Sequence, residues 1–210
     1  PGEVIAYTDN DCYFFPGWLS NSLKILEVFP NVGMVTSRPV AMDQVFNTNT
    51  LAWAFNDPEA TVETARFLDW ENFRSFTMSL GISEEDTRCL YKTHQDTVVT
   101  YRGQRAFVGA MHYQFIAYKK ILKDFLPFSM DRPMGQVRQL DVRVNEAHYL
   151  RLMTPEPYMN NMSNQIPDWV GKLKKNTSKK KVKFHLKNFK LVKWLLMQLY
   201  DWIFRIYWKE

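Results

Sequence analysis

The chain has 210 residues, of which 46% are hydrophobic and 15% aromatic. This composition excludes a disordered chain and suits one packed domain, or one domain with an appendage. The formal net charge of +5 is unevenly divided, because residues 172–210 hold 12 Lys and Arg against 2 Asp and Glu, whereas the first 171 residues hold 15 against 20. We therefore expect a mildly acidic body followed by a strongly basic tail.

The cysteine content and the start of the chain add two expectations. Cys12 and Cys89 are too few for a disulfide framework, which favours a reducing compartment such as the cytoplasm. Pro1 stands only a few residues before the first strand that we predict. We therefore expect an N-terminal part of the domain to precede it.

The first forty residues have the pattern of a parallel sheet. Residues 3–8 are an apolar run bounded by turn residues, which predicts a buried strand. Leu19, Leu23, Leu26 and Phe29 follow at helical spacing, and residues 32–37 read as a second buried strand. Strand, helix and strand within about 30 residues is the pattern of a βαβ unit.

The rest of the chain is predicted with the same signals of spacing and turn residues. We expect helices at 57–80, 112–125 and 141–149, two strands around a glycine turn at 97–111, a strand at 149–154 and a loop at 155–167. The predicted organisation is a globular domain at 1–170, a basic linker at 171–183 and an amphipathic helix at 184–210.

Two carboxylates follow the first predicted strand, in the sequence Asp9-Asn10-Asp11. The carboxyl ends of parallel strands open onto the crevice where α/β proteins bind ligands. Two carboxylates at such a place can share Mg²⁺ or Mn²⁺, which neutralises the charge that develops on a departing diphosphate. Asp-Asn-Asp also suits an ordinary polar turn.

The segment IAYTDNDCYFFPGWLSNSLKILEVFPNVGMVTSRPV, from Ile5 to Val40, resembles the central segment of a GT-A-fold glycosyltransferase, similar to family 2. The resemblance reaches about Asn164. It implies an α/β fold with a Rossmann-like mixed sheet flanked by helices, and a nucleotide-binding part before the D-x-D motif. It also implies that Asp11 binds Mn²⁺ or Mg²⁺, that Asp9 contacts the metal or the nucleotide ribose, and that Asn10 lies beside the substrate.

The resemblance also implies a catalytic base. In the similar family a carboxylate at a helix start takes the proton from the attacking hydroxyl, and Asp141 falls at the matching place. Asp141 also suits a simple N-cap, since aspartate is a preferred residue there. Glu146 is the nearest substitute for the base.

Four further positions are implied as binding residues. The segment 108–122 resembles the part that shapes the acceptor site, where Gly109 would admit a sugar and where His112 and Gln114 would bind hydroxyls. A histidine at such a position also suits a structural role. Asn161 matches the place where relatives carry a metal-binding histidine, which makes it a possible third metal ligand or an ordinary loop residue.

The basic tail carries apolar residues at helical spacing from Phe184 onward. It is too interrupted for a membrane-spanning helix. It suits a helix in the membrane interface, with lysines on anionic headgroups and Trp194, Trp202 and Trp208 at the boundary. A helix that packs on the body or binds a partner is an alternative. Because no recognition fold accompanies the lysines, we expect no nucleic-acid partner.

These expectations combine into a metal-dependent glycosyltransferase, inverting in its stereochemistry and peripheral at the cytoplasmic side of a membrane. It would move a sugar from a nucleotide-diphosphate donor to a hydroxyl of a glycan, lipid or protein. Two alternatives stay open, namely a sugar-phosphate nucleotidyltransferase and a non-catalytic, membrane-docked glycan-binding or scaffold domain.

Overall fold

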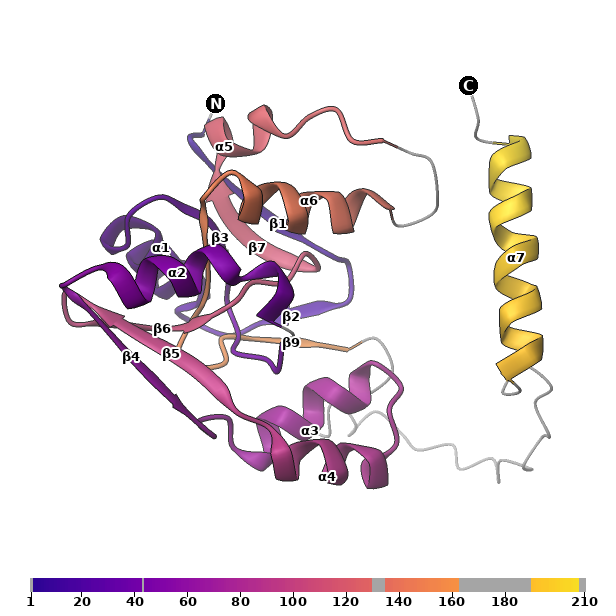
Figure 1. Cartoon of the computed structure of the whole chain (residues 1–210), viewed down its shortest axis with the longest axis horizontal. Helices are drawn as coiled ribbons and strands as arrows, with labels where there is room; N and C mark the ends of the chain where they lie inside the picture. The colour runs from indigo at the N-terminus through magenta and orange to yellow at the C-terminus, as the bar shows by residue number, and fades with distance from the viewer. Residues whose placement is uncertain (1, 43, 130–134, 163–189, 208–210) are drawn as a thin grey trace.

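Figure 1 shows a computed structural model of the chain, which describes residues 2–42, 44–129, 135–162 and 190–207. In chain order its elements are β1 (Val4–Thr8), β2 (Cys12–Phe14), α1 (Trp18–Val28), β3 (Val32–Thr36), the 3₁₀ helix η1 (Gln44–Phe46), α2 (Thr48–Asn56), β4 (Ala60–Ala65), α3 (Trp70–Ser79), α4 (Glu84–Thr93), β5 (Asp96–Tyr101), β6 (Gln104–Val108), β7 (Gln114–Tyr118), α5 (Lys119–Asp124), α6 (Gly135–Glu146), β8 (Leu150–Met153), β9 (Met159–Asn161) and α7 (Lys190–Tyr207).

Seven of the strands form one mixed sheet in the order β1-β7-β3-β8-β6-β5-β4, and β2 pairs with β9 separately. The sheet is flanked by helices, which confirms the predicted α/β class. β3 and β8 are parallel, while β7 is antiparallel to both β1 and β3. β1 and β3 therefore run in the same direction, as the βαβ pattern predicts, but β7 lies between them.

β1 and β3 differ in burial, although the sequence predicts both of them as buried strands. All five residues of β3 are buried, as expected. β1 lies at the edge of the sheet and exposes three of its five residues, so the prediction that it is buried is wrong. β1 packs against β7, and the rings of Tyr7 and Phe115 stack with their centroids 5.3 Å apart.

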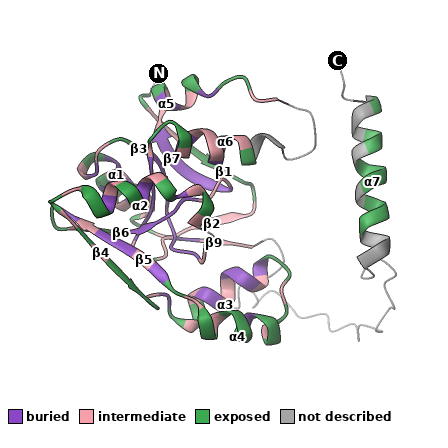
Figure 2. Cartoon of the chain, in the orientation of Figure 1, coloured by how far each residue is buried: buried purple, intermediate pink, exposed green. Residues whose placement is uncertain are grey.

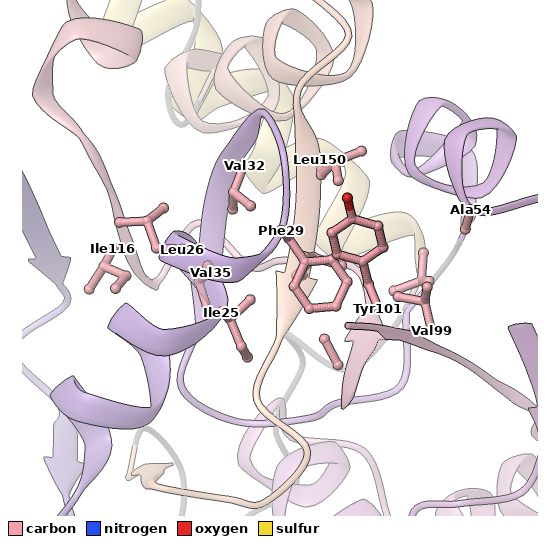
Figure 3. Packing of buried hydrophobic residues seen from close by; sticks show 13 residues of the cluster. Ile25, Leu26, Phe29, Val32, Val35, Ala54, Val99, Tyr101, Ile116 and Leu150 are labelled. Carbon is pink, nitrogen blue, oxygen red and sulfur yellow. The ribbon is translucent and has the colours of Figure 1, made fainter. Parts of the chain in front are cut away.

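Helices cover both faces of the sheet. On one face Ile25 and Leu26 of α1, with Phe29 directly after the helix, pack against Val32 and Val35 of β3 (Figure 3). Residues of α2 join the same cluster. On the other face, side chains of α5 and α6 pack against the sheet; this cluster includes Met34, Phe115, Ala117, Ile121, Phe125, Leu140 and Val144. Figure 2 shows this buried centre in purple.

The predicted helix at 57–80 is wrong in its first half. Asp57-Pro58 ends α2, and Ala60–Ala65 then forms β4, an edge strand paired with β5. The helix α3 starts only at Trp70, where the Asp69 side chain accepts a hydrogen bond from the Asn72 N–H at 2.8 Å. The β-branched residues of β4 favour a strand over the helix that the aromatic spacing suggested.

The predicted helix at 112–125 is also wrong over its first half. His112 and Tyr113 form a turn, Gln114–Tyr118 is β7, and α5 begins only at Lys119. β7 is an inner strand between β1 and β3, and four of its five residues are buried. Strands buried on both faces have continuous apolar runs that periodicity does not separate from helices. The consequence is that His112 lies in a turn and not at a helix start.

Two other elements differ in extent from their predictions. α6 begins at Gly135, so Asp141 lies inside this helix and is not its N-cap. The predicted loop at 155–167 contains β9, which pairs with β2. The strand predicted at 149–154 and the hairpin predicted at 97–111 are confirmed as β8 and as β5 with β6.

The tail helix is present as α7 over Lys190–Tyr207. The predicted linker at 171–183 and the predicted helix ends at 184–189 and 208–210 lie outside the described residues. The described large apolar residues of α7 are about half exposed, and Figure 2 colours their part of the ribbon green. Among the described residues, no helix is both long and apolar enough to cross a membrane.

Candidate functional site

The D-x-D residues form a turn between β1 and β2, at the carboxyl end of β1. The Asp9 N–H donates to the Tyr113 carbonyl at 2.8 Å, and the Tyr7 hydroxyl donates to Asp9 Oδ1 at 3.1 Å. Asp9 and Asn10 are exposed, while Asp11 is half-buried. The motif therefore presents two carboxylates of different accessibility on one anchored turn.

Asn161, which the resemblance implied as a possible third metal ligand, lies on the strand beside this turn. β2 pairs with β9 so that Cys12 is directly opposite Asn161. The next residue, Met162, donates its N–H to the Asp11 carbonyl at 2.8 Å. The β2–β9 pairing thus brings the backbone of Asn161 next to the residues that end the D-x-D turn.

The connection between β6 and β7, residues 109–113, crosses the carboxyl ends of β1 and β3. At β3 the Met111 N–H donates to Thr36 Oγ1 at 2.8 Å. At β1 the Tyr113 carbonyl accepts the Asp9 N–H. This connection, which we call the β6–β7 crossing, places its own side chains next to the D-x-D turn.

His112 of the β6–β7 crossing contacts Asp141 of α6, with 3.0 Å between Nδ1 and Oδ2. The other carboxylate oxygen, Oδ1, accepts from Arg151 Nη2 of β8 at 2.5 Å. The side chain of Asp141 is 8% exposed and that of Arg151 only 1%, whereas that of His112 is 32% exposed. Asp141 is therefore an interior carboxylate that joins a buried cation to an accessible imidazole.

Arg151 is held by several carbonyl oxygens as well as by Asp141. Nη2 donates to the Ala110 carbonyl at 2.5 Å, and Nη1 donates to the carbonyls of Phe46 and Asp141 at 3.2 and 3.3 Å. Burial lowers the pKa of Arg151, and the neighbouring Asp141 charge opposes this shift. Arg151 is not among the residues predicted from the sequence, although a charge inside the apolar run YLRLMT was a signal for it.

Two other predicted binding residues serve the fold. Gln114 is fully buried, and its Oε1 accepts the Ser37 N–H at 2.7 Å. Gly109 has φ +136°, and a Cβ there would lie 2.6 Å from the Met42 sulfur, so methionine side chains fill the space that we expected for a sugar. We leave Gln114 and Gly109 out of the candidate site.

A second buried arginine lies near the D-x-D turn and was also missed. Arg38 follows β3, and its Nη2 donates to the Asn72 carbonyl at 3.0 Å and to Ser75 Oγ at 3.2 Å. Burial lowers the pKa of Arg38 and raises that of the neighbouring Tyr113 hydroxyl. Tyr113 therefore remains a protonated, neutral side chain below the D-x-D turn.

Within the described part of the chain, no group of three or more His, Cys, Asp and Glu is arranged to hold a metal ion. The oxygen-bearing side chains on the D-x-D turn and on the strand beside it are two carboxylates and one amide. This set suits a hard cation such as Mg²⁺ that takes its remaining ligands from substrate phosphates and water.

Comparison of the chain with protein-family models, with curated proteins and with solved structures finds no match. The site must therefore be interpreted from its own chemistry.

Proposed function

We propose that this chain is the catalytic part of a metal-dependent glycosyltransferase that uses a nucleotide-diphosphate sugar. The observation that supports this most directly is the β6–β7 crossing. Its consecutive residues His112 and Tyr113 contact Asp141 on one side and Asp9 on the other. The crossing therefore links a group that can take a proton to the turn that carries two carboxylates. Both are at the carboxyl ends of strands, where α/β folds bind ligands.

The donor would bind at the D-x-D turn. Asp9 and Asp11 would hold Mn²⁺ or Mg²⁺, with the Asn161 amide as a neutral third ligand, since hard divalent cations favour oxygen. When bound, the cation neutralises charge on the leaving diphosphate. Asn10 is exposed between the two carboxylates and would face the bound substrate.

Transfer to a hydroxyl requires a nearby proton acceptor. The acceptor hydroxyl attacks the anomeric carbon, the bond from this carbon to the diphosphate oxygen breaks, and the hydroxyl proton passes to the protein. A direct displacement of this kind inverts the anomeric centre. The His112–Asp141 pair supplies titratable groups at the correct end of the sheet.

We further propose that α7 binds an anionic membrane surface. At about 100° per residue, one arc of α7 carries Leu195, Leu196, Leu199, Trp202, Ile203 and Ile206, which are all 40–61% exposed. The preceding sequence is rich in lysine, which anionic headgroups attract. This arrangement suits a helix lying in the interface.

The donor proposal is tested by thermal unfolding of the complete natural protein with UDP, GDP and dTDP, each with and without Mn²⁺. A nucleotide at 100 times its Kd should stabilise the native state by about 2.7 kcal/mol. We expect Mn²⁺-dependent stabilisation by one nucleotide, and its loss in Asp11→Asn. Stabilisation by none of the three, or stabilisation that Asp11→Asn retains, contradicts the proposed site. Binding without sugar transfer would instead favour the non-catalytic glycan-binding domain.

Membrane binding is tested by sedimenting the chain with vesicles. We expect binding to vesicles that contain phosphatidylserine, weakened by salt and by Trp202→Glu. Phe55→Glu on α2 is the control, because Phe55 is also exposed, at 69%, but lies on the body. Equal binding by both variants would show that α7 does not carry the contact.

A further inference from the structure

We infer that His112 is the proton acceptor of the proposed transfer and that Asp141 positions it. The inference rests on the proposed function and changes the roles that the resemblance implied, in which Asp141 was the base and His112 bound a hydroxyl. It starts from the accessibility of the two side chains, since His112 is 32% exposed and Asp141 8%. An acceptor hydroxyl must reach the group that receives its proton, and the imidazole is the more accessible of the two.

Both oxygens of Asp141 already have hydrogen-bond donors. Oδ1 lies 2.5 Å from Arg151 Nη2, and Oδ2 lies 3.0 Å from His112 Nδ1. A carboxylate whose two oxygens already accept hydrogen bonds has little free acceptor capacity left for a substrate hydroxyl. Asp141 therefore has the surroundings of a group that orients a neighbour.

The same contacts determine which nitrogen of His112 is basic. We assign the imidazole proton to Nδ1, because the oxygen that faces it belongs to a carboxylate that also accepts a hydrogen bond from Arg151. Nε2 then carries the lone pair, and among the described residues the structure gives it no hydrogen-bond partner. A carboxylate that fixes the tautomer of a catalytic histidine in this way is familiar from acyl-transfer enzymes.

His112 is also near the proposed donor site. Its neighbour Tyr113 accepts the Asp9 N–H through the backbone carbonyl. The charged group in contact with the imidazole is Asp141, which Arg151 contacts in turn. Asp11 and Arg38 lie near the hydroxyl of the next residue, Tyr113.

The proton transfer balances without a further reagent. As the hydroxyl oxygen bonds to the anomeric carbon, its proton moves to Nε2 of His112, and the electron pair of the broken carbon–oxygen bond stays on the diphosphate. The resulting imidazolium is stabilised by the Asp141 carboxylate at Nδ1. The imidazolium then returns its proton to solvent, which regenerates the base.

The test measures release of nucleoside diphosphate by the complete natural protein from UDP-, GDP- and dTDP-linked hexoses with Mn²⁺. His112→Asn removes Nε2 but retains a donor for Asp141, and we expect kcat to fall about 10²- to 10⁴-fold. His148→Asn is the matched control, because His148 is exposed and its φ of +62° is one that asparagine tolerates. We expect this variant to have the wild-type kcat.

Chemical rescue separates the two assignments. We expect imidazole to restore part of the activity of His112→Ala but none of that of Asp141→Ala, with thermal unfolding confirming that each variant folds. Rescue of Asp141→Ala by formate, together with near-normal turnover of His112→Asn, would assign the base to Asp141 and overturn the inference. An inactive wild-type protein with every donor would overturn the proposed function itself, and this inference with it.

Discussion

Replacing Arg151 by methionine tests whether the Arg151–Asp141 pair holds the interior of the site. The side chains of Arg151 and Asp141 are 1% and 8% exposed, with 2.5 Å between Nη2 and Oδ1. Arg151→Met leaves the carboxylate inside the protein without its guanidinium and removes the donors to the carbonyls of Ala110 and Phe46. Breaking a buried pair from one side costs about 3–5 kcal/mol of the free energy of unfolding.

This cost corresponds to a large change in melting temperature. For a chain of about 200 residues, 1 kcal/mol shifts Tm by about 2–4 °C, so we expect Arg151→Met to lower Tm by roughly 6–20 °C. Arg102→Met is the control, because Arg102 Nε lies 2.6 Å from Glu59 Oε2 but both side chains are more than half exposed. Exposed pairs contribute little, so the control should melt close to the wild type.

The assay is thermal and urea unfolding followed by tryptophan fluorescence. The double variant Arg151→Met/Asp141→Asn should recover part of the loss, because it no longer leaves a buried charge uncompensated. Equal Tm values for Arg151→Met and Arg102→Met would refute the reasoning, because burial would then make no difference to the cost of breaking an ion pair. A double variant that is less stable than Arg151→Met would refute it as well.

Three further predictions concern stability. Gly109 has φ +136°, and an added Cβ there would lie 2.6 Å from a methionine sulfur. Gly109→Ala should therefore lower the free energy of unfolding in urea by about 1–3 kcal/mol. The loss should exceed that of Gly103→Ala, where an added Cβ meets no atom within 4 Å. Asp96 Oδ2 accepts the N–H groups of two loop residues at 2.9 Å, so Asp96→Asn should lose about 1.5–3 kcal/mol, and Asp86→Asn at an exposed position much less. Burial raises the pKa of Tyr113, so its native state disfavours the phenolate; the free energy of unfolding should fall as pH rises above about 10, and Tyr113→Phe should flatten that slope.

The parts of the fold that the sequence predicted well are those with local causes. The helix α1, the strand β3 and the β5–β6 hairpin each have an apolar pattern bounded by proline or glycine. The D-x-D turn is at the end of β1, as expected, because the apolar run stops there. Asn161 is also beside this turn, although the β2–β9 pairing that brings it there was not predicted.

The parts that were missed depend on residues far apart in the chain. β7 forms a strand because it pairs with β1 on one edge and β3 on the other. The sequence of β7 itself contains no signal of either neighbour. The partners of Asp141 are His112, 29 positions before it, and Arg151, 10 positions after it. Their meeting is set by tertiary packing, so sequence spacing identified Asp141 and His112 as candidates but not as a pair.

The β6–β7 crossing has a consequence for how this chain can vary. Its few residues are fixed to β3 through Met111, to β1 through Tyr113 and to α6 through His112. Inserting or deleting a single residue there would move at least two of these anchors out of reach together. The hairpin tip at Arg102-Gly103, at the other end of β6, is exposed, and its ion pair with Glu59 is exposed as well. We expect length changes in natural or engineered variants to collect at the hairpin tip and to be absent from the crossing.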